Sequence, residues 1–301
     1  MPWRWMIQNW LRGLAEEKIR ETVMEAAREH VSAAAGPGAA ESPVCDVGVT
    51  FALGEESGGL EDRLTGLVTT KGDGFTIRRG DWQGRRVAVA LSGAGRSAAA
   101  KATEAVILGH RPGWVFSAGF CGGLSDKLRR HDILVADRVA DVEGNEIAVD
   151  LQRIHSAGLL SGQGVHVGRL LTLDAVARRP REKQALGRDY DALGVDLESF
   201  AVAEVCRRRG PAFLAIRVVS DAVDDELPRE VDRLARQKSR AGQFGAALGA
   251  ILDRPGALKQ MLQLKENSLQ SSDRLAKFLI RLIEHLVPAP PPPPPPASAP
   301  S

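Results

Sequence analysis

Short apolar runs alternate with helical patterns between residues 44 and 252. Apolar runs predict strands at residues 44–51, 86–91, 114–117, 132–136, 165–173 and 212–219. Helical spacing at residues 97–108 and 196–208 predicts two of the helices between them. Apolar strands that alternate with helices are typical of a sheet covered on both faces. We therefore predict an α/β fold, a three-layer α/β/α body with a mixed, mostly parallel central sheet, over residues 44–252.

An apolar stripe also marks the first 33 residues. Its members recur at helical spacing: Trp3, Met6, Ile7, Trp10, Leu11 and Leu14. They predict an amphipathic helix over residues 1–33 that packs on the body or on a partner subunit. A second interpretation is weak contact with a membrane surface, because Trp suits that interface. Residues 34–43, rich in Ala and Gly, predict a linker.

The C-terminal part predicts a helix followed by an extended tail. A second stripe lies within residues 256–287, which we interpret as a C-terminal helical extension: Leu275, Phe278, Leu279, Leu282, Ile283 and Leu286. Residues 288–301 hold nine of the 17 prolines and predict a disordered polyproline tail. Such a tail is either solvated or a ligand for a proline-binding module.

Composition narrows the function classes. The net charge of +2 and the 5% aromatic content argue against a dedicated nucleic-acid binder. No apolar run reaches the roughly 18 residues that a membrane span needs. The three cysteines are widely spaced, which excludes a disulfide framework and fits a reducing, cytoplasmic location: Cys45, Cys121 and Cys206.

Candidate ligand-binding residues follow the predicted strands. Glu56, residues 93–95, residues 119–123, Asp174 and Asp221 all lie just beyond a predicted strand. Ligands of open α/β sheets bind beyond the carboxyl ends of the strands. We therefore expect these residues to share one site.

Cofactor and metal motifs are missing. The turn at residues 93–95 lacks the third Gly of a dinucleotide fingerprint, because position 98 is Ala. The chain has no phosphate-binding P-loop motif and no H-E-x-x-H, so we expect neither an organic cofactor nor a metal. The remaining carboxylates suit glycosidic bond cleavage, in which one acid protonates the leaving group and one base activates water. Glu56, Glu198 and Asp221 could fill these roles if the fold brings them together.

Five ordered segments resemble the nucleoside phosphorylase/nucleosidase superfamily. They are closest to its 5′-methylthioadenosine/S-adenosylhomocysteine nucleosidase branch. The segments are A-L-G-E-E at 52–56, the Gly-rich turn at 92–99, G-G-L through D-I-L-V at 122–135, V-D-L-E-S-F-A-V-A at 195–203, and A-I-R-V-V-S-D at 215–221. The resemblance covers residues 44–252. It implies a nucleoside phosphorylase-like fold and a purine nucleoside, a small molecule, as substrate. The family also implies a homodimer.

The resemblance assigns acid and base roles. Asp221 matches the acid that protonates N7 of the departing purine, and Ser220 and Arg217 match neighbours that orient it and line the site. The alternative for Arg217 is a structural ion pair. Glu56 matches the base that activates water, with Glu55 as a competitor for that position, and no metal takes part.

The resemblance also assigns substrate contacts. Glu198 matches the carboxylate that holds the ribose hydroxyls, and Leu197 replaces a Met that packs on the ribose. Val176 and Ala177 match positions that pack on the purine and bind its edge through the main chain. Gly95 belongs to the Gly-rich turn of the site.

Departures from the family pattern keep alternatives open. Phe120 stands where the branch has a small Ser near the water, and residues 137–164 align with no motif of the 5′ pocket. The expected activity is therefore a nucleosidase for a 5′-substituted adenosine, or one for a bulkier adenosyl lipid. The second enzyme hypothesis is a phosphorylase, in which Arg96 would be the best candidate ligand for phosphate. The hypothesis without catalysis is a scaffold protein that binds a nucleoside.

Overall fold

The computed structural model describes residues 45–227 and 257–288. The predicted N-terminal helix (1–33), the linker (34–43) and all but the first residue of the proline tail lie outside the described residues.

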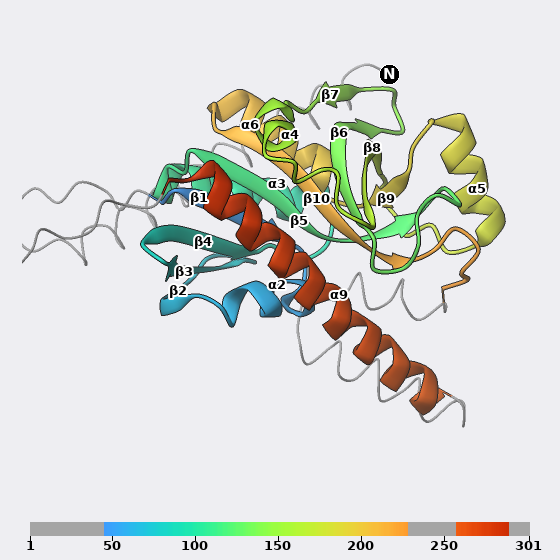
Figure 1. Cartoon of the computed structure of the whole chain (residues 1–301), viewed down its shortest axis with the longest axis horizontal. Coiled ribbons are helices and arrows are strands. Elements are labelled where there is room, and N and C mark those ends of the chain that lie inside the picture. The colour runs from blue at the N-terminus through green and yellow to red at the C-terminus, as the bar shows by residue number, and fades with distance from the viewer. Residues whose placement is uncertain (1–44, 228–256, 289–301) are drawn as a thin grey trace, which may run out of the picture.

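Ten strands and six helices make up the described part of the chain (Figure 1). The strands are β1 (Val47–Phe51), β2 (Thr65–Lys71), β3 (Thr76–Trp82), β4 (Arg85–Leu91), β5 (Trp114–Gly123), β6 (Ile133–Asp141), β7 (Glu146–Ala148), β8 (Val165–Thr172), β9 (Gly194–Asp196) and β10 (Ala212–Asp221). The helices are α2 (Gly54–Glu61), α3 (Arg96–His110), α4 (Gln152–Ser156), α5 (Pro180–Asp189), α6 (Ser199–Arg209) and α9 (Ala257–Leu286).

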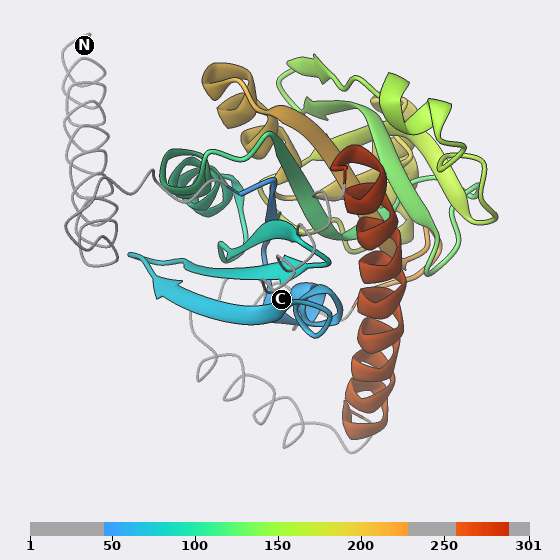
Figure 2. The same cartoon turned by 60° about the vertical axis from the view of Figure 1, so that its left-hand side comes forward.

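The strands form one mixed sheet. Its centre is parallel: β4 pairs with β1, β1 with β5, and β5 with β10. Strand β10 also pairs antiparallel with β6, and β6 continues through β8 and β9 back to β5, so these five strands close a ring. The antiparallel strands β3 and β2 extend the other edge (Figure 2). The predicted α/β fold with helices on both faces is confirmed.

Alternate residues of the central strands face opposite helical layers. On β4, Val87 and Val89 join the apolar cluster that contains α9, whereas Ala88 and Ala90 join the cluster that contains α3. This is the two-residue side-chain period of a strand buried on both faces. Helices α3 and α6 cover one face, and α2 and α9 lie together on the other (Figures 1 and 2).

Helix α9 is part of the main core. Its predicted stripe is buried in the same cluster as β1 and β10, and the stripe residues are Leu275, Phe278, Leu279, Leu282, Ile283 and Leu286. Figure 1 shows α9 as the long red helix that crosses the front of the sheet beside α2. No helix in the described ranges is long and apolar enough to span a bilayer.

The structure differs locally from the sequence prediction at three places. No apolar pattern predicted helix α2, which begins at Gly54, because the Glu56 side chain closes its first turn by accepting the N–H of the N-cap residue Leu53. Helix α6 starts at Ser199 and not at Asp196: its N-cap residue is Glu198, and the Asp196 carboxylate accepts the N–H of Ser199, the first residue of the helix. The strand predicted to end at Ser117 continues to Gly123.

Candidate active site

Glu56 is held by three backbone amides. Its Oε2 accepts the N–H groups of Ala52 (3.0 Å) and Leu53 (2.9 Å), and its Oε1 accepts the N–H of Phe120 (2.8 Å). The side chain is buried, and burial raises its pKa, against the opposing effects of Arg217 and the three amides. The carboxylate is therefore fixed between the first turn of α2 and the end of β5.

Gly119 on β5 makes room for two charged side chains. A Cβ atom there would lie 2.7 Å from Glu56 Oε1 and 2.9 Å from Arg217 Nη1. Any side chain at this position would displace one of them. The glycine therefore lets the carboxylate and the guanidinium approach the same stretch of backbone.

Arg217 is a buried cation among acceptors. Its Nε lies 2.8 Å and its Nη2 2.7 Å from Asp196 Oδ2, and Nη2 also donates to the hydroxyls of Ser117 and Ser199. Glu198 Oε2 lies 3.9 Å from the same Nη2. Burial lowers the pKa of Arg217, but Asp196, Glu198 and Glu56 together raise it. Arg217 does not orient Asp221 as expected, because its partner is Asp196; this is the structural ion pair considered as its alternative.

Glu198 is positioned by the Gly-rich turn. Gly95 has a φ of +98°, which only glycine adopts readily, and its N–H donates to Glu198 Oε1 at 2.8 Å. Among the residues that the structure describes, the contacts of Glu198 Oε2 are longer: 3.3 Å to Leu197 N and 3.9 Å to Arg217 Nη2. This oxygen is the more available one for a hydroxyl group of a ligand.

The environment of Glu198 disfavours its charge. Burial, followed by the nearby Asp196, raises its pKa to about 7; Arg217 opposes the shift and Glu56 adds to it. Perturbed carboxylates of this kind cluster at functional sites.

Asp221 ends β10 beside a bulge. The register of β10 against β5 shifts between Val219 and Asp221, and such bulges redirect side chains next to active sites. Asp221 Oδ1 lies 2.6 Å from Ser220 Oγ, and Oδ2 accepts a hydrogen bond from Lys183 Nζ. A Cβ at Gly122 would lie 3.2 Å from Asp221 Oδ2, so a second glycine of β5 admits this carboxylate.

The three predicted carboxylates line one edge of the sheet. Glu56 contacts β5 at residues 119 and 120, and Asp221 contacts it at Gly122. At ~3.3 Å per residue these points are about 7–10 Å apart, the scale of a nucleoside. Glu198 is linked to Glu56 through Arg217. The structure therefore brings Glu56, Glu198 and Asp221 into one neighbourhood, and all three are buried.

The remaining predicted contacts lie in two apolar clusters or next to one of the acids. The side chain of Phe120 packs on the main apolar cluster. Leu197 and Ala177 share a smaller cluster under α5, and Val176 is half-buried next to it in the chain. Ser220 contacts Asp221, as the resemblance implies.

Arg96 is occupied by protein groups. Its Nε lies 3.2 Å from Asp174 Oδ1, its Nη1 3.6 Å from Asp141 Oδ2, and its Nη2 donates to the Thr172 carbonyl at 3.0 Å. A phosphate ion would have to compete with two carboxylates for this guanidinium. The residue expected to serve a phosphorylase is therefore already neutralised.

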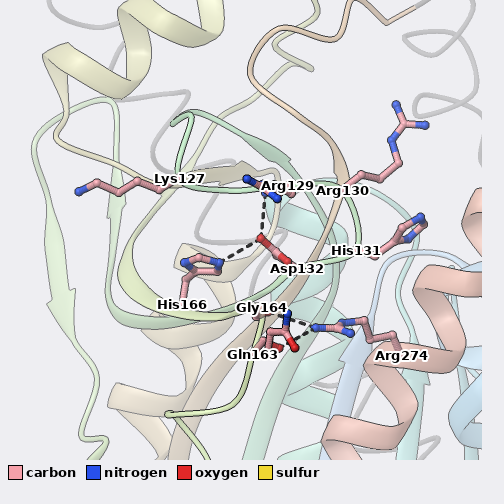
Figure 3. A pocket seen from close by; sticks show the side chains of 9 residues that line it. All are labelled: Lys127, Arg129, Arg130, His131, Asp132, Gln163, Gly164, His166 and Arg274. Atoms are coloured by element: carbon pink, nitrogen blue, oxygen red, sulfur yellow. Dashed lines mark hydrogen bonds and ion pairs between the residues drawn. The ribbon is translucent and has the colours of Figure 1, made fainter.

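A basic hollow of about 590 Å³ lies elsewhere and contains none of the predicted site residues (Figure 3). It joins the β5–β6 loop, the start of β8 and the middle of α9. At its centre Asp132 Oδ2 lies 3.0 Å from His166 Nε2. The side chains of Lys127 and Arg130 point away from Asp132, so the cationic groups do not converge.

Two charged residues of the site were not predicted. Asp196 lies two positions before Glu198 in the same motif, and that spacing was the available signal. Lys183 on α5 is fully buried and donates to Asp221. Its sequence signal is weak: Leu186 and Tyr190 follow it at helical spacing and share a cluster, which places the lysine on an inward stripe. Among the described residues, no three His, Cys, Asp or Glu side chains form a group that could hold a metal ion.

Comparison with known proteins gives the family. The model of the Phosphorylase superfamily matches residues 46–254. A 5′-methylthioadenosine/S-adenosylhomocysteine nucleosidase of Haemophilus influenzae is 24% identical over 222 residues, which cover 66% of this chain and 96% of the relative. The nucleosidase of the same name from Shewanella putrefaciens is 27% identical over 207 residues, with 62% and 90% covered.

Solved structures show the same fold. The Helicobacter pylori 5′-methylthioadenosine/S-adenosylhomocysteine nucleosidase has a TM-score of 0.61 at 18% identity and covers 80% of this chain and 98% of its own. A futalosine hydrolase mutant from the same organism has a TM-score of 0.59 at 19% identity, with 80% and 99% covered. Two different substrates therefore occur on this one scaffold. The matched region contains Glu56, Glu198 and Asp221, and the chain belongs to the Phosphorylase superfamily.

Proposed function

We propose that this protein is a purine nucleosidase that hydrolyses the N-glycosidic bond of a 5′-substituted adenosine and releases adenine. The observation that carries the proposal is the convergence of Glu56, Glu198 and Asp221 around β5, with Arg217 between the first two. The names of the curated relatives supply the substrate class.

Each carboxylate has one step. Glu56 removes a proton from water as the water oxygen attacks C1′ of the sugar. The C1′–N9 bond breaks and its electron pair passes to the purine, which takes a proton from Asp221 at N7. Glu198 holds the ribose hydroxyls and stabilises the positive charge that develops on the sugar. The products are the free base and the 5-substituted ribose.

The charges favour water over phosphate. Glu56 and Glu198 repel a dianion, and Arg96 and Arg217 are both held by carboxylates. Phe120 stands where the family has a small residue near the water, and residues 137–164 match no motif of the 5′ pocket. A nucleoside with a bulkier 5′ group, such as an adenosyl lipid, is therefore the second candidate substrate.

A direct assay tests the proposal. Purified protein is incubated with 5′-methylthioadenosine, with and without phosphate, and free adenine is measured. We expect equal release in both buffers, and an Asp221→Asn variant that is slower by about 10²–10⁴-fold. Asp224→Asn, an exposed neighbour, is the matched control. Strict dependence on phosphate would establish a phosphorylase, and binding of the nucleoside without cleavage would establish a scaffold.

We also propose a homodimer in a reducing, cytoplasmic location. The family resemblance supports the dimer, and the three buried, unpaired cysteines support the compartment. Weak membrane contact through residues 1–33 is proposed from the apolar stripe alone.

A further inference from the structure

Lys183 is a fully buried lysine on a helix whose other residues are exposed or half-buried. The residues on either side of it, Glu182 and Gln184, are exposed, and Lys183 is the one buried residue of α5. Lysine is almost never fully buried unless it is paired. Its position therefore needs partners that compensate the loss of water.

The ammonium group has three partners. Nζ donates to Asp221 Oδ2 and to the carbonyl oxygens of Ala222 and Asp225, both at 2.9 Å. These acceptors match the three hydrogens of the ammonium group. Lys183 therefore ties α5 to the end of β10 at the proposed acid.

The backbone is shaped to bring this lysine close. A Cβ at Gly187, one turn further along α5, would lie 2.3 Å from the Leu124 carbonyl oxygen, which is closer than any side chain allows. The glycine lets α5 pack directly on the chain that leaves β5. The same packing places Lys183 beside Asp221.

Lys183 distinguishes the two oxygens of the Asp221 carboxyl group. An ammonium has no acceptor, so Oδ2 beside it must accept and cannot donate. The other oxygen, Oδ1, lies 2.6 Å from Ser220 Oγ, and that hydroxyl lies 3.1 Å from the Cys121 carbonyl.

Ser220 can serve both protonation states of Asp221. When Asp221 is ionised, the hydroxyl donates to Oδ1. When Oδ1 carries a proton, the serine hydrogen turns to the Cys121 carbonyl, and Ser220 Oγ can accept the proton of Oδ1 until the purine N7 takes its place. The hydrogen-bond network therefore accepts a proton on Oδ1 and rejects one on Oδ2.

We propose that Lys183 is a positioning residue that makes Oδ1 of Asp221 the oxygen that delivers the proton to the purine. The inference rests on the proposed nucleosidase function. The O–H bond at Oδ1 breaks and an N–H bond forms at N7, while the C1′–N9 electron pair passes to the base. The ammonium beside Oδ2 stabilises the carboxylate that remains. The proton that Glu56 took from water later passes through solvent to Asp221, which returns both side chains to their starting states.

The test distinguishes a loss of leaving-group protonation from a general loss of active-site structure. Two substrates are compared: 5′-methylthioadenosine, whose base leaves with a proton, and the 4-nitrophenyl glycoside of 5-methylthioribose, whose anion leaves without one. We expect Lys183→Met to lower kcat for the nucleoside by about 10²-fold, with KM within about threefold. On the nitrophenyl glycoside the same variant stays within about threefold of wild type, and Asp221→Asn shows the same asymmetry.

Controls keep the outcomes distinct. Lys101→Met removes a lysine of α3 that pairs with Asp73 between β2 and β3, and it should leave both activities unchanged. If Lys183→Met does not fold because Asp221 stays buried and unpaired, the double variant with Asp221→Asn removes both charges. Its rates should equal those of Asp221→Asn alone, because Lys183 acts through Asp221.

Three results would overturn the inference. They are equal losses on both substrates, no loss on either, or a double variant that is at least tenfold slower than Asp221→Asn on the nucleoside. In each of these the wild-type enzyme still releases adenine, so the nucleosidase proposal stands. If the wild-type protein releases no adenine, the nucleosidase proposal fails and the role of Lys183 fails with it.

Discussion

Replacing Glu198 by Gln should stabilise the protein at alkaline pH and stabilise it much less at acid pH. Glutamine resembles the protonated form of Glu198 and can still accept the Gly95 N–H through its amide oxygen. The substitution therefore removes only the cost of holding a negative charge at a buried site beside Asp196 and Glu56.

The magnitude follows from the pKa of Glu198. Burial and the neighbouring carboxylates raise it from 4.5 to about 7. The difference between 7 and 4.5, at about 1.4 kcal/mol per pH unit, corresponds to about 3 kcal/mol. Because the folded-state pKa is the higher one, the folded protein binds more protons between these values, and its stability falls as the pH rises from 4.5 to 7. The gain in Glu198→Gln is therefore about 3 kcal/mol at pH 8 and about 1 kcal/mol at pH 5.

Urea denaturation of wild type and variant at pH 5 and pH 8, at one ionic strength, measures the difference. Glu143→Gln, at an exposed loop position, is the matched control and should show no pH-dependent gain. The variant should also lose nucleosidase activity, because it cannot offer a negative charge to the sugar cation. A stability gain that is equal at both pH values, or a loss at pH 8, would show that burial does not penalise the charged form of Glu198.

Three further substitutions test other parts of the structure. Gly119→Ala places a Cβ 2.7 Å from Glu56 Oε1 and 2.9 Å from Arg217 Nη1, and should lower kcat/KM by about 10²-fold, measured by adenine release. Arg217→Met leaves Asp196 without its buried partner and should cost about 3–5 kcal/mol in denaturant unfolding, whereas a cost under 1 kcal/mol would contradict the ion-pair role. Leu279→Ala on α9 should cost about 2–5 kcal/mol, and no measurable change would show that α9 lies outside the cooperative core.

Much of the candidate site was predictable, because its residues lie at positions with a local signal in the sequence, such as the end of an apolar run or a Gly-rich turn. Asp221 follows an apolar strand, Gly95 stands in a turn that needs positive φ, and Glu56 follows a strand in a family-like segment. Helix α2 was missed because its residues have little amphipathic pattern. The Glu56 carboxylate closes its first turn by accepting backbone N–H groups, and a periodicity search does not detect that interaction.

Strands β2 and β3 were also not predicted, and for β2 the reason is different. The residues of β2 are mostly exposed at the sheet edge, so they carry no apolar run. Helix α9 shows the opposite case: its apolar stripe was evident, but only the folded chain showed that the stripe fills the same core as the central strands.

Local periodicity and motif spacing were enough to predict the α/β class, the positions of the main strands along the chain and the acidic residues that follow them. The tertiary structure decided which charges meet. In the folded chain Arg217 pairs with Asp196, and Lys183 donates a hydrogen bond to Asp221. Arg96 pairs with Asp141 and Asp174. Two charged residues that are far apart in the sequence become partners because whole helices and strands pack together. A local sequence pattern contains no information on that packing, so it cannot predict the pairs.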